Sequence, residues 1–478
     1  MDGGHSAIAL DEGETARAAA GVLASLRELG AGAGDRIAVM AETTAEFVAA
    51  RDAVTALGAA MVPVNPKLTA PEVSYILGHA GARAILAQDD LRSIAAAAAP
   101  RGSAVLPLGG CAVAPDKRSA AGTGGREIGA TVIYTSGTTG SPKGCVRTEA
   151  QELARAEEMI ATYGLCEADT HLIACPLAHS APGILLRACR RAGARTVLMR
   201  KFEPRAFLAA AEAHRATVFF LVPTQYERIL ALPAGELGRY DLSSVRAAIV
   251  AGAPIAPRTK ERIARRLGPG VLWEFYGSSE TGTITVCSPE QQLARPGSVG
   301  TPPPGVQVSL LSERGEPVSP GEVGEVAVRS PSVMSGYLEP RQGVLDRSAS
   351  SPYGVVLGDL GRFDRDGYLY LVDRKHDTII TGGVNVYPAE VERALCEHPD
   401  VNAAVVAGVA DAAWGQRVAA LVARAKGGAN ADDLRSFLRD RIAPFKIPKQ
   451  IEFVGPDEVP VGSSGKPLRR EAARRLAH

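Results

Sequence analysis

One segment of eleven residues combines the groups that would bind a phosphate. From Tyr134 to Gly144 the sequence contains five hydroxyl side chains besides the tyrosine, three glycines and one lysine. Glycines let the backbone approach a phosphate closely, hydroxyl and amide groups donate hydrogen bonds to its oxygens, and the lysine supplies compensating charge. The apolar stretch 130–133 predicts a strand that leads into this loop. The spacing differs from that of the common P-loop, and the alternative interpretation is a flexible linker.

Two other polar segments also follow predicted strands. Residues 276–281 read Tyr-Gly-Ser-Ser-Glu-Thr after the strand 271–275, and residues 251–254 read Ala-Gly-Ala-Pro after the strand 247–250. Ligands in α/β proteins bind at the carboxyl ends of strands. Taken alone, the first segment could be a turn followed by a capped helix, and the second a plain turn.

A lysine near the C-terminus lies in a similar glycine-serine context. Residues 463–466 read Ser-Ser-Gly-Lys, and such a loop could carry the ammonium group of Lys466 into a site. The alternative is a solvated basic tail. The arginines that follow are expected to form a solvated helix face; they are Arg469, Arg470, Arg474 and Arg475.

Together and in this order, these segments resemble the motifs of the AMP-forming adenylating enzymes. This family includes acyl-CoA synthetases, the adenylation domains of peptide synthetases, and luciferases. The resemblance covers nearly the whole chain, and residues 222–225 and 296–302 look most similar to bacterial fatty-acyl and aryl-acid CoA ligases. It implies that the protein binds ATP, Mg²⁺ and coenzyme A.

The resemblance implies a nucleotide site made of residues from several segments. Tyr276 is expected near the adenine, Asp359 is expected to accept hydrogen bonds from both ribose hydroxyls, and Arg374 is expected to reach the ribose and phosphate. Asp359 and Arg374 could instead be members of a surface ion pair. The predicted ATP- and AMP-binding residues are Thr135, Ser136, Gly137, Thr138, Thr139, Gly140, Gly252, Ala253, Pro254, Tyr276, Gly277, Asp359 and Arg374.

Four residues are predicted by the resemblance to act in catalysis. Lys466 would bridge the carboxylate and the α-phosphate, where a positive charge stabilises the transition state. Lys143 would contact the outer phosphates, and Glu280 would hold Mg²⁺ with Thr138, since this ion prefers oxygen ligands. His179, in the segment 176–182, is expected beside the acyl carboxylate, although a lone histidine is more often structural.

The resemblance also implies an acyl pocket and a tunnel for the thiol arm of coenzyme A. The pocket residues are small or apolar, which predicts an uncharged aliphatic or aryl acid; they are Ser180, Phe220, Val250, Gly277 and Ser278. No Asp or Glu occurs between residues 169 and 203, which argues against an α-amino acid. The tunnel residues are Gly382, Gly383, Val384, Trp414 and Phe445. Both aromatic residues could instead belong to the core.

Length and alternating patterns predict an α/β protein with more than one domain. A helix at 15–29, a strand at 36–40, a helix at 43–57 and a strand at 59–64 form a βαβ pattern typical of a parallel sheet. We therefore expect a large N-terminal domain, residues 1–373, with a small β-subdomain at about 297–370. A smaller α+β domain is expected at 377–478, and the resemblance implies that it is a mobile lid. The resemblance also implies a hinge at 374–376, where His376 replaces the Lys or Asp that the family usually has.

Composition argues against several other classes of protein. The chain has 478 residues with 53 basic and 52 acidic side chains, so a nucleic-acid or membrane-surface partner is not expected. No apolar run is long enough to span a membrane, and the start shows no signal-peptide pattern. Seven scattered cysteines without a Cys-x-x-Cys motif favour reduced thiols and a cytoplasmic location.

The favoured hypothesis is an acid–CoA ligase that forms an acyl-adenylate and then transfers the acyl group to the thiol of coenzyme A. Its partners would be a small-molecule acid, ATP and coenzyme A, and the protein would be a monomer or homodimer. One alternative is an adenylating enzyme that loads a carrier-protein phosphopantetheine or another nucleophile. A second alternative is a nucleotide-binding regulatory protein that has lost catalysis.

Overall fold

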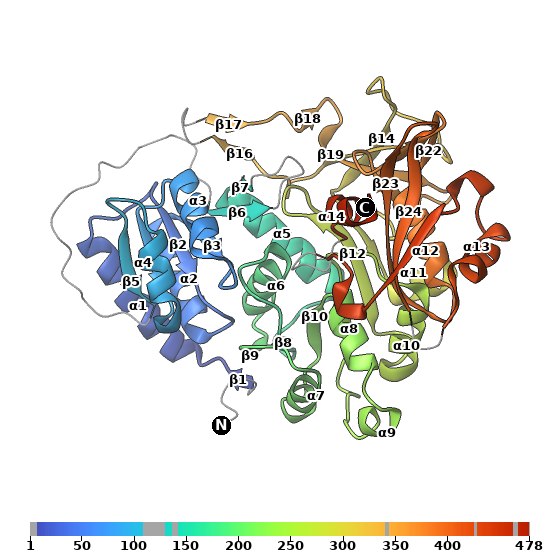
Figure 1. The fold of residues 1–478 in the computed structure, drawn as a ribbon. Coiled ribbons are helices and arrows are strands. Elements are labelled where there is room, and N and C mark those ends of the chain that lie inside the picture. Colours follow the sequence, from blue (N-terminus) through green and yellow to red (C-terminus); the bar gives the residue numbers. More distant parts are fainter. Residues whose placement is uncertain are drawn as a thin grey trace.

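The structure, a computed structural model, is built on four β-sheets (Figure 1). It describes residues 7–108, 130–135, 142–339, 344–424, 428–461 and 467–477. Three sheets and most helices form a large mixed α/β N-terminal domain, and the fourth sheet forms a smaller α+β C-terminal domain. This arrangement confirms the predicted fold class. The predicted strand 36–40 has the expected bounds, whereas the predicted helix 15–29 runs from Glu12 to Glu28.

The first sheet has eight strands in the order β17-β16-β7-β6-β3-β2-β4-β5. Its central strands are parallel because helices return the chain between them. These elements are β2 (Arg36–Met40), β3 (Ala60–Val64), β4 (Ala84–Ala87), β5 (Ala104–Pro107), β6 (Thr131–Thr135), β7 (Lys143–Arg147), β16 (Gly336–Glu339) and β17 (Val344–Asp346), with α1 (Glu12–Glu28), α2 (Ala45–Leu57), α3 (Ala70–Ala80), η1 (Asp89–Leu91) and α4 (Arg92–Ala98).

The second sheet has seven strands in the order β1-β9-β8-β10-β11-β12-β13. Strands β8, β10, β11 and β12 are parallel neighbours, so their carboxyl ends meet at one edge. The strands are β1 (Ala7–Ala9), β8 (Thr170–Ile173), β9 (Arg195–Met199), β10 (Val218–Leu221), β11 (Ala247–Val250), β12 (Leu272–Ser278) and β13 (Gly282–Cys287). The helices are α5 (Glu149–Tyr163), α6 (Ser180–Arg191), α7 (Pro204–Ala213), α8 (Pro223–Leu230), α9 (Ala234–Leu237), α10 (Pro257–Leu267) and α11 (Pro289–Ala294).

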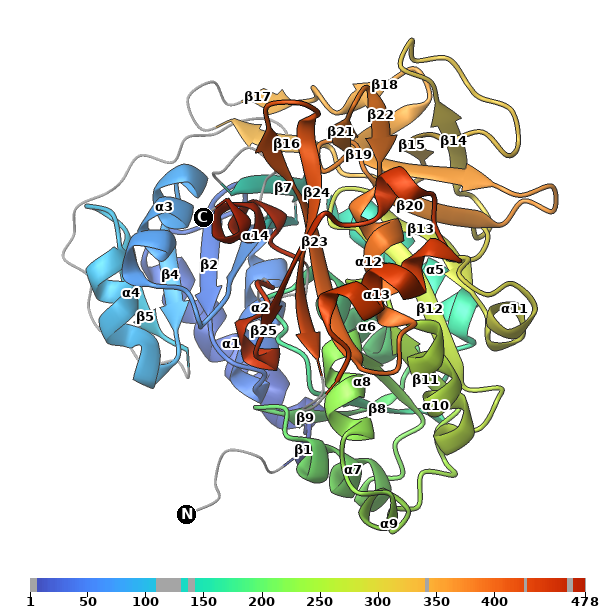
Figure 2. The same ribbon diagram turned by 45° about the vertical axis from the view of Figure 1, so that its right-hand side comes forward.

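Antiparallel strands form the third sheet, and the fourth lies in the C-terminal domain (Figure 2). The third contains β14 (Gln307–Leu311), β15 (Gly324–Arg329), β18 (Ser350–Ser351), β19 (Gly354–Phe363) and β20 (Leu369–Arg374). The fourth contains β21 (Ile379–Thr381), β22 (Val384–Val386), β23 (Val401–Asp411), β24 (Gly415–Arg424) and β25 (Gln450–Val454). Its companions are α12 (Pro388–Cys396), α13 (Ala431–Arg439), η2 (Pro444–Lys446), η3 (Pro456–Glu458) and α14 (Arg469–Leu476).

An apolar cluster joins the first two sheets. Phe47 on α2 and Leu186 on α6 are both buried in it, together with Ile173 on β8 and Val39 on β2. Helices α3 and α4 cover the opposite face of the first sheet. Because close-packed interiors resist relative movement, the two sheets provide one rigid base for residues at their edges.

Helix α5 connects the two sheets and has clear end signals. Thr148 Oγ1 accepts a hydrogen bond from the Gln151 backbone N–H, and Gln151 Oε1 accepts one from the Thr148 backbone N–H, which forms a capping box. The helix ends at Gly164, whose φ of 57° is a conformation that glycine adopts readily. This helix places Glu152 and Arg155 on its buried side.

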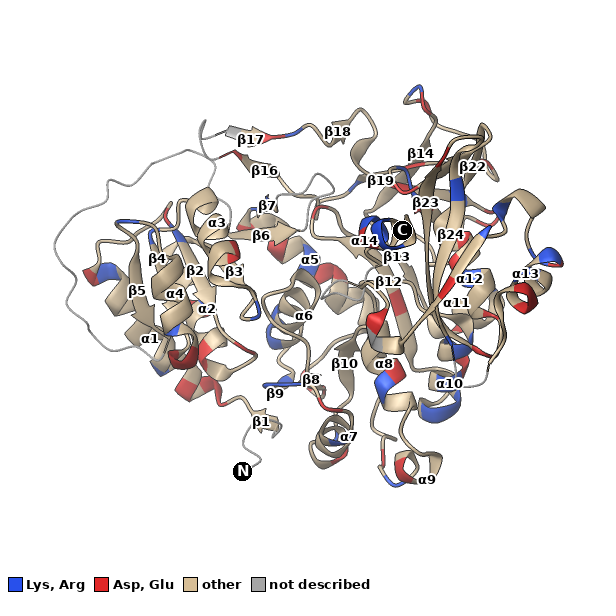
Figure 3. Ribbon diagram, in the orientation of Figure 1, with Lys and Arg blue, Asp and Glu red and all other residues tan. Residues whose placement is uncertain are grey.

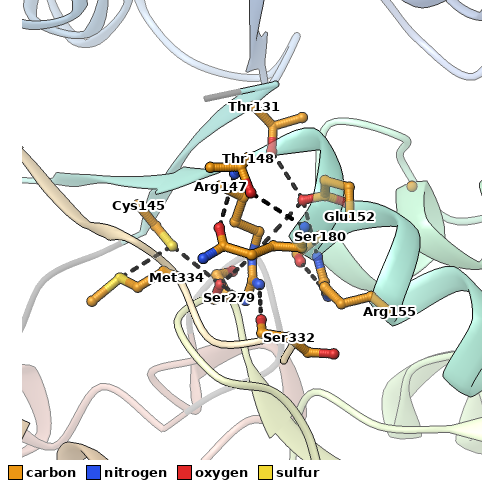
Figure 4. A network of polar contacts seen from close by, with 12 residues as sticks. Thr131, Cys145, Arg147, Thr148, Glu152, Arg155, Ser180, Ser279, Ser332 and Met334 are labelled. Atoms are coloured by element: carbon orange, nitrogen blue, oxygen red, sulfur yellow. Dashed lines mark hydrogen bonds and ion pairs between the residues drawn. The ribbon is translucent and has the colours of Figure 1, made fainter. Parts of the chain in front are cut away.

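A buried polar network surrounds Arg147 at the end of β7 (Figure 4). Its side chain is 0% exposed, and its Nε donates to the carbonyl oxygen of Ser279 at 2.9 Å. A second guanidinium nitrogen donates to the carbonyl oxygen of Ser332. The guanidinium also lies 3.8 Å from the carboxylate of Glu152. Arg147 therefore ties the β12–β13 turn and the chain before β16 to the first sheet.

Glu152 and Arg155 extend this network toward α6. Glu152 accepts from Thr131 Oγ1 at 2.9 Å and lies 3.4 Å from Arg155, which donates to Ser180 Oγ at 2.9 Å. Burial alone would raise the pKa of Glu152, but the two guanidinium groups and the threonine outweigh it and hold this pKa below its usual range. Burial lowers the pKa of Arg147 to about 10, so it stays protonated at neutral pH.

Positive and negative side chains are interspersed over the domains, although α10 carries several basic residues (Figure 3). The six cysteines within the described residues are free thiols. Among the helices of the described residues, none is long and apolar enough to cross a lipid bilayer.

We predict that Arg147→Met lowers the free energy of unfolding by about 3 kcal/mol, because it leaves buried acceptors without their donor and a buried carboxylate with one cation fewer. Urea denaturation measures this change. Arg187→Met is a suitable control, because it removes a more exposed pair with Glu149 and should cost about 1 kcal/mol or less. Equal losses in the two variants would contradict a structural role for the buried network.

The buried His171 on β8 makes stability depend on pH. Its side chain is 1% exposed, and burial lowers its pKa from 6.5 to about 3. Below pH 6.5 the imidazole of His171 is protonated in the unfolded chain but not in the folded chain, so the free energy of unfolding falls as pH decreases from 6.5 toward 3. Between pH 7 and pH 5 this residue should remove about 2 kcal/mol. Urea midpoints of His171→Phe should therefore fall less over this interval than those of the wild type; parallel curves would contradict this.

Candidate active site

The ends of the predicted phosphate loop form the base of a β-hairpin. Thr135 ends β6 and pairs directly with Lys143, the first residue of β7. The predicted loop residues between them, Ser136, Gly137, Thr138, Thr139 and Gly140, lie outside the described residues. Helix α3 contacts both ends of this segment: Tyr75 Oη donates to the Pro142 carbonyl at 3.1 Å, and His79 Nδ1 lies 2.8 Å from Tyr134 Oη.

The predicted acyl and metal motif lies at the turn between β12 and β13. The possible helix is not formed, because β12 extends through Tyr276 and Gly277 to Ser278 and pairs back with β13. A Cβ atom on Gly277 would lie 2.2 Å from the Gly282 carbonyl oxygen, so only glycine fits there. Ser278 Oγ accepts from the backbone N–H of Glu280 at 3.1 Å, which fixes the backbone at this glutamate.

Glu280 lies beside both ends of the β6–β7 hairpin. Its side chain is buried, and its Oε1 accepts from Thr135 Oγ1 at 3.1 Å and from Tyr337 Oη at 3.2 Å. The Nζ of Lys143 lies 5.0 Å from the centre of the Tyr337 ring. Sequence reasoning missed Tyr337, which carries no motif and reaches the site because β16 pairs with β7.

The donor set around Glu280 suits Mg²⁺ better than a metal held wholly by protein side chains. Among the described residues, no group of three or more His, Cys, Asp or Glu side chains could hold a metal ion. Mg²⁺ is often bound by one or two carboxylates together with substrate phosphates and water. A single buried carboxylate next to a threonine hydroxyl fits this pattern.

Asp359 is held by two of the other predicted nucleotide residues. Tyr276 Oη donates to its Oδ2 at 2.6 Å, and Arg374 Nε donates to its Oδ1 at 3.1 Å. Asp359 and Arg374 are direct partners on β19 and β20. Burial raises the pKa of Tyr276, and the neighbouring carboxylate raises it further. A carboxylate fixed in this way keeps lone pairs that can accept from two vicinal hydroxyls.

Several predicted residues follow the carboxyl ends of adjacent parallel strands. His179 comes after β8, and Gly252, Ala253 and Pro254 come directly after β11. Gly252 has a φ of 92°, and both Gly252 and Pro254 are exposed. His179 precedes α6, and burial together with the charge of Lys67 lowers its pKa, so the imidazole is neutral at physiological pH.

The predicted acyl-pocket residues differ in exposure. Ser180 is half-buried, whereas Phe220 is 5% exposed and Val250 is 0% exposed within the core of the second sheet. The Phe220 ring lies 6.1 Å from that of Phe275, measured between centres. The hydroxyl of Ser180 accepts a hydrogen bond from the buried Arg155. A cationic group that sequence reasoning missed therefore lies next to this predicted acyl-pocket residue.

The predicted thiol-arm residues lie on the C-terminal domain. Gly382 and Gly383 form the turn of the β21–β22 hairpin, with φ values of 57° and 79°. A Cβ on Gly382 would lie 2.6 Å from the ring of Trp414, and the Gly382 N–H donates to the Trp414 carbonyl at 2.9 Å. Val384 is 44% exposed. Because Gly382 has no Cβ atom, the exposed indole of Trp414 packs directly on its backbone.

Trp414 and Phe445 are surface residues rather than core residues. They are 48% and 45% exposed. The Nζ of Lys449 lies 4.0 Å from the Trp414 ring centre, and that of Lys446 lies 5.8 Å from the Phe445 ring centre. An exposed ring beside a cation suits stacking with a purine that carries phosphate groups.

Lys466 lies outside the described residues, but the chain on each side is described. Val461 and Pro467 form an isolated antiparallel β-bridge, and the Leu468 N–H donates to the Pro460 carbonyl at 2.8 Å. Helix α14 follows. His376 comes after β20, and its Nε2 lies 3.5 Å from Asp377 Oδ1.

The prediction that the arginines of α14 form a solvated face is wrong for Arg469, the first residue of this helix. The side chain of Arg469 is 13% exposed and contacts three carboxylates, those of Asp373, Asp377 and Glu392. Arg475 does lie on the outer face, where it pairs with Glu471 one turn earlier. Sequence could not separate them, because the carboxylates come from outside α14.

Comparison with known proteins identifies the family. The model of the AMP-binding enzymes matches residues 13–338, and that of the AMP-binding enzyme C-terminal domain matches residues 390–466. A feruloyl-CoA synthase from Amycolatopsis sp is 34% identical over 476 residues, which cover 99% of this chain and 95% of that protein.

Two solved structures share the fold over almost the whole chain. An amide bond synthetase from Marinactinospora thermotolerans has a TM-score of 0.88 at 32% identity, covering 98% of this chain and 95% of its own. An ATP-bound protein from Rhodopseudomonas palustris has a TM-score of 0.87 at 28% identity, covering 100% and 97%. The chain therefore belongs to the AMP-binding enzyme family and is an adenylate-forming acid ligase.

Proposed function

We propose that the protein is an acid–CoA ligase that activates an uncharged aliphatic or aryl acid with ATP. The proposal that the protein binds ATP rests on the Asp359 carboxylate, which accepts hydrogen bonds from both Tyr276 and Arg374. The pairing of Gly382 with an exposed Trp414 supports coenzyme A as the acceptor.

In the first half-reaction, a carboxylate oxygen of the acid attacks the α-phosphorus of ATP. A new P–O bond forms, the bond from the α-phosphorus to the bridging oxygen breaks, and pyrophosphate leaves. Asp359 would accept hydrogen bonds from the two ribose hydroxyls, and the backbone of Gly252, Ala253 and Pro254 would face the adenine. Lys466 would neutralise charge that develops on the α-phosphate.

The outer phosphates would lie between Lys143 and the hydroxyl-rich loop. Glu280 and Thr138 would hold Mg²⁺, which neutralises phosphate charge when bound. The neutral His179 would lie beside the acid carboxylate at the start of α6. A neutral imidazole can orient the carboxylate through a hydrogen bond without forming a tight ion pair that would oppose the attack.

In the second half-reaction, the thiolate sulfur of coenzyme A attacks the acyl carbon, and AMP leaves with the bonding electron pair. The thiol arm would pass along Gly382, Gly383 and Val384. The nucleotide end would contact Trp414 and Phe445. Lys449 supplies positive charge beside Trp414, whereas Lys446 is paired with Glu390. The C-terminal domain, joined to the N-terminal domain through residues 374–376, would rotate between the two half-reactions.

Another acceptor remains the second candidate, because one solved structure of high similarity is an amide bond synthetase. Its acceptor would be an amine rather than a thiol. A carrier-protein phosphopantetheine would use the same glycine-lined path as coenzyme A.

The proposed function is tested with a panel of aliphatic and aryl acids. We expect acid-dependent exchange of pyrophosphate into ATP with at least one acid, followed by thioester formation when coenzyme A is added. Exchange without thioester, but with product when an amine or a phosphopantetheinylated carrier is supplied, would favour the second candidate. Absence of exchange with every acid would contradict both.

Asp359→Asn should raise the KM for ATP by roughly 10- to 100-fold, because an amide accepts weaker hydrogen bonds from the ribose than a carboxylate does. The diagnostic comparison uses 2′-deoxy-ATP. The wild type should lose affinity for this analogue relative to ATP, and the variant should lose less. If both proteins discriminate equally against the analogue, Asp359 does not contact the ribose.

Lys466→Ala should lower the rate of adenylate formation by about two to three orders of magnitude, the usual effect of removing a group that stabilises developing charge. A chemically prepared adenylate should still react with coenzyme A at the wild-type rate. Arg475→Gln on α14 is the control and should leave both steps unchanged, because its pair with Glu471 is on the surface. Unchanged adenylation in Lys466→Ala would refute the assignment.

A further inference from the structure

Asp373 is a residue of one domain whose side chain binds the other. Its backbone belongs to β20 and pairs with Leu360 in the third sheet. Its Oδ2 accepts from the Ala389 backbone N–H at 2.7 Å, in the first turn of α12. Its Oδ1 lies 3.5 Å from Arg469 Nη1 on α14. The side chain is 1% exposed, so both contacts are shielded from water.

The other carboxylates around Arg469 follow the segment 374–376 in the chain. Asp377 Oδ2 lies 2.7 Å from Arg469 Nη1, and Glu392 Oε2 lies 2.8 Å from Nη2. Glu392 also accepts from the Val406 backbone N–H on β23 at 2.9 Å, which fixes it within the C-terminal domain. Of the three carboxylates, Asp373 alone precedes the segment that connects the domains.

Rotation about His376 would affect these contacts unequally. Arg469, Glu392 and Asp377 would move together and keep their ion pairs. Asp373 would stay with the third sheet and lose both Ala389 and Arg469. Breaking a buried charged contact costs more than breaking an exposed pair, such as that of Lys375 with Glu325, in which the lysine is 55% exposed.

The orientation of the domains indicates which half-reaction these contacts favour. Helix α14, which begins three residues after Lys466 in the sequence, lies on the side of the C-terminal domain that faces the β6–β7 hairpin (Figures 1 and 2). The β21–β22 hairpin with Gly382 and Gly383 lies instead beside the third sheet in both views. In this orientation α14, rather than the β21–β22 hairpin, lies toward the β6–β7 hairpin (Figures 1 and 2), as expected for the adenylating half-reaction.

We infer that Asp373 is a positioning residue that latches the C-terminal domain in the adenylating orientation through Ala389 and Arg469. The inference rests on the proposed function, because it assumes two half-reactions with different domain orientations. The proposed role of Asp373 requires no contact with the nucleotide or the acid. It acts by stabilising one orientation relative to the other.

The test compares Asp373→Ala and Asp373→Asn with Glu392→Gln, and it measures the two half-reactions separately. Asp373→Ala should slow pyrophosphate exchange by roughly 10- to 100-fold, whereas a prepared adenylate should react with coenzyme A at least as fast as in the wild type. Asp373→Asn should be intermediate, because an amide oxygen can still accept from Ala389. Glu392→Gln removes a carboxylate from Arg469 within one domain and should leave the ratio of the two rates unchanged.

A second measurement does not depend on activity. Trypsin can cleave after Arg374 and Lys375, which lie between the domains and are held to Asp359 and Glu325. Cleavage there should be several-fold faster in Asp373→Ala than in the wild type or Glu392→Gln, while cleavage elsewhere should be unchanged.

Two results would overturn the inference: equal changes of both half-reactions in Asp373→Ala, or a shift of their ratio in Glu392→Gln as large as that in Asp373→Ala. Failure of the proposed function looks different, because the wild type itself would then show no exchange. In that case the trypsin comparison still decides whether Asp373 holds the domains together; unchanged cleavage in Asp373→Ala would reject the latch.

Discussion

The arrangement of the site depends on the hydrogen bonds that the buried guanidinium of Arg147 donates. It donates to the carbonyl oxygens of Ser279 and Ser332, two backbone segments that are far from β7 in the sequence. Ser279 directly precedes Glu280, so the position of the guanidinium fixes where that carboxylate meets Thr135. The β6–β7 hairpin and the β12–β13 turn are thereby held in one geometry, although they belong to different sheets.

Such a network specifies a geometry more than it adds stability. Burying two arginines and a glutamate costs desolvation free energy, which their mutual attraction and hydrogen bonds offset. The benefit is directional: a guanidinium can donate along several fixed directions, whereas an apolar side chain of the same size would leave the Ser332 carbonyl without this donor and the Ser279 carbonyl with the weaker S–H donor of Cys145. The apolar cluster between the first two sheets supplies the rigidity that keeps these directions constant.

The two domains use charge in different ways. In the N-terminal domain, Asp359 and Glu280 are held by neutral and cationic donors but keep free lone pairs, which suits ligand binding. At the boundary, the Arg469 guanidinium and the three carboxylates around it, including that of Asp373, satisfy one another. A satisfied cluster that crosses a domain boundary resists rotation until its contacts break, which makes it suited to holding an orientation.

Local sequence signals were enough to predict the main strands and helices and the fold class. Apolar runs predicted β2 and β11 with their actual bounds, because these signals depend on neighbouring residues. The motif order predicted Glu280, Asp359 and Arg374 as site residues, and the structure brings Asp359 together with both Arg374 and Tyr276. The helix that residues 277–281 could have formed alone is absent, because pairing with β13 outweighs the local preference.

Other features of the site depend on contacts between segments that are distant in sequence. Arg147, Tyr337, Arg155 and Asp373 carry no motif, and their roles arise because partners distant in sequence meet in space. Arg469 and Arg475 lie on the same short helix, yet one is buried among carboxylates and the other faces solvent. Local sequence records a residue's type and its period along the chain. The electrostatic environment of a buried charge depends on groups from other strands and helices, and folding alone brings these together.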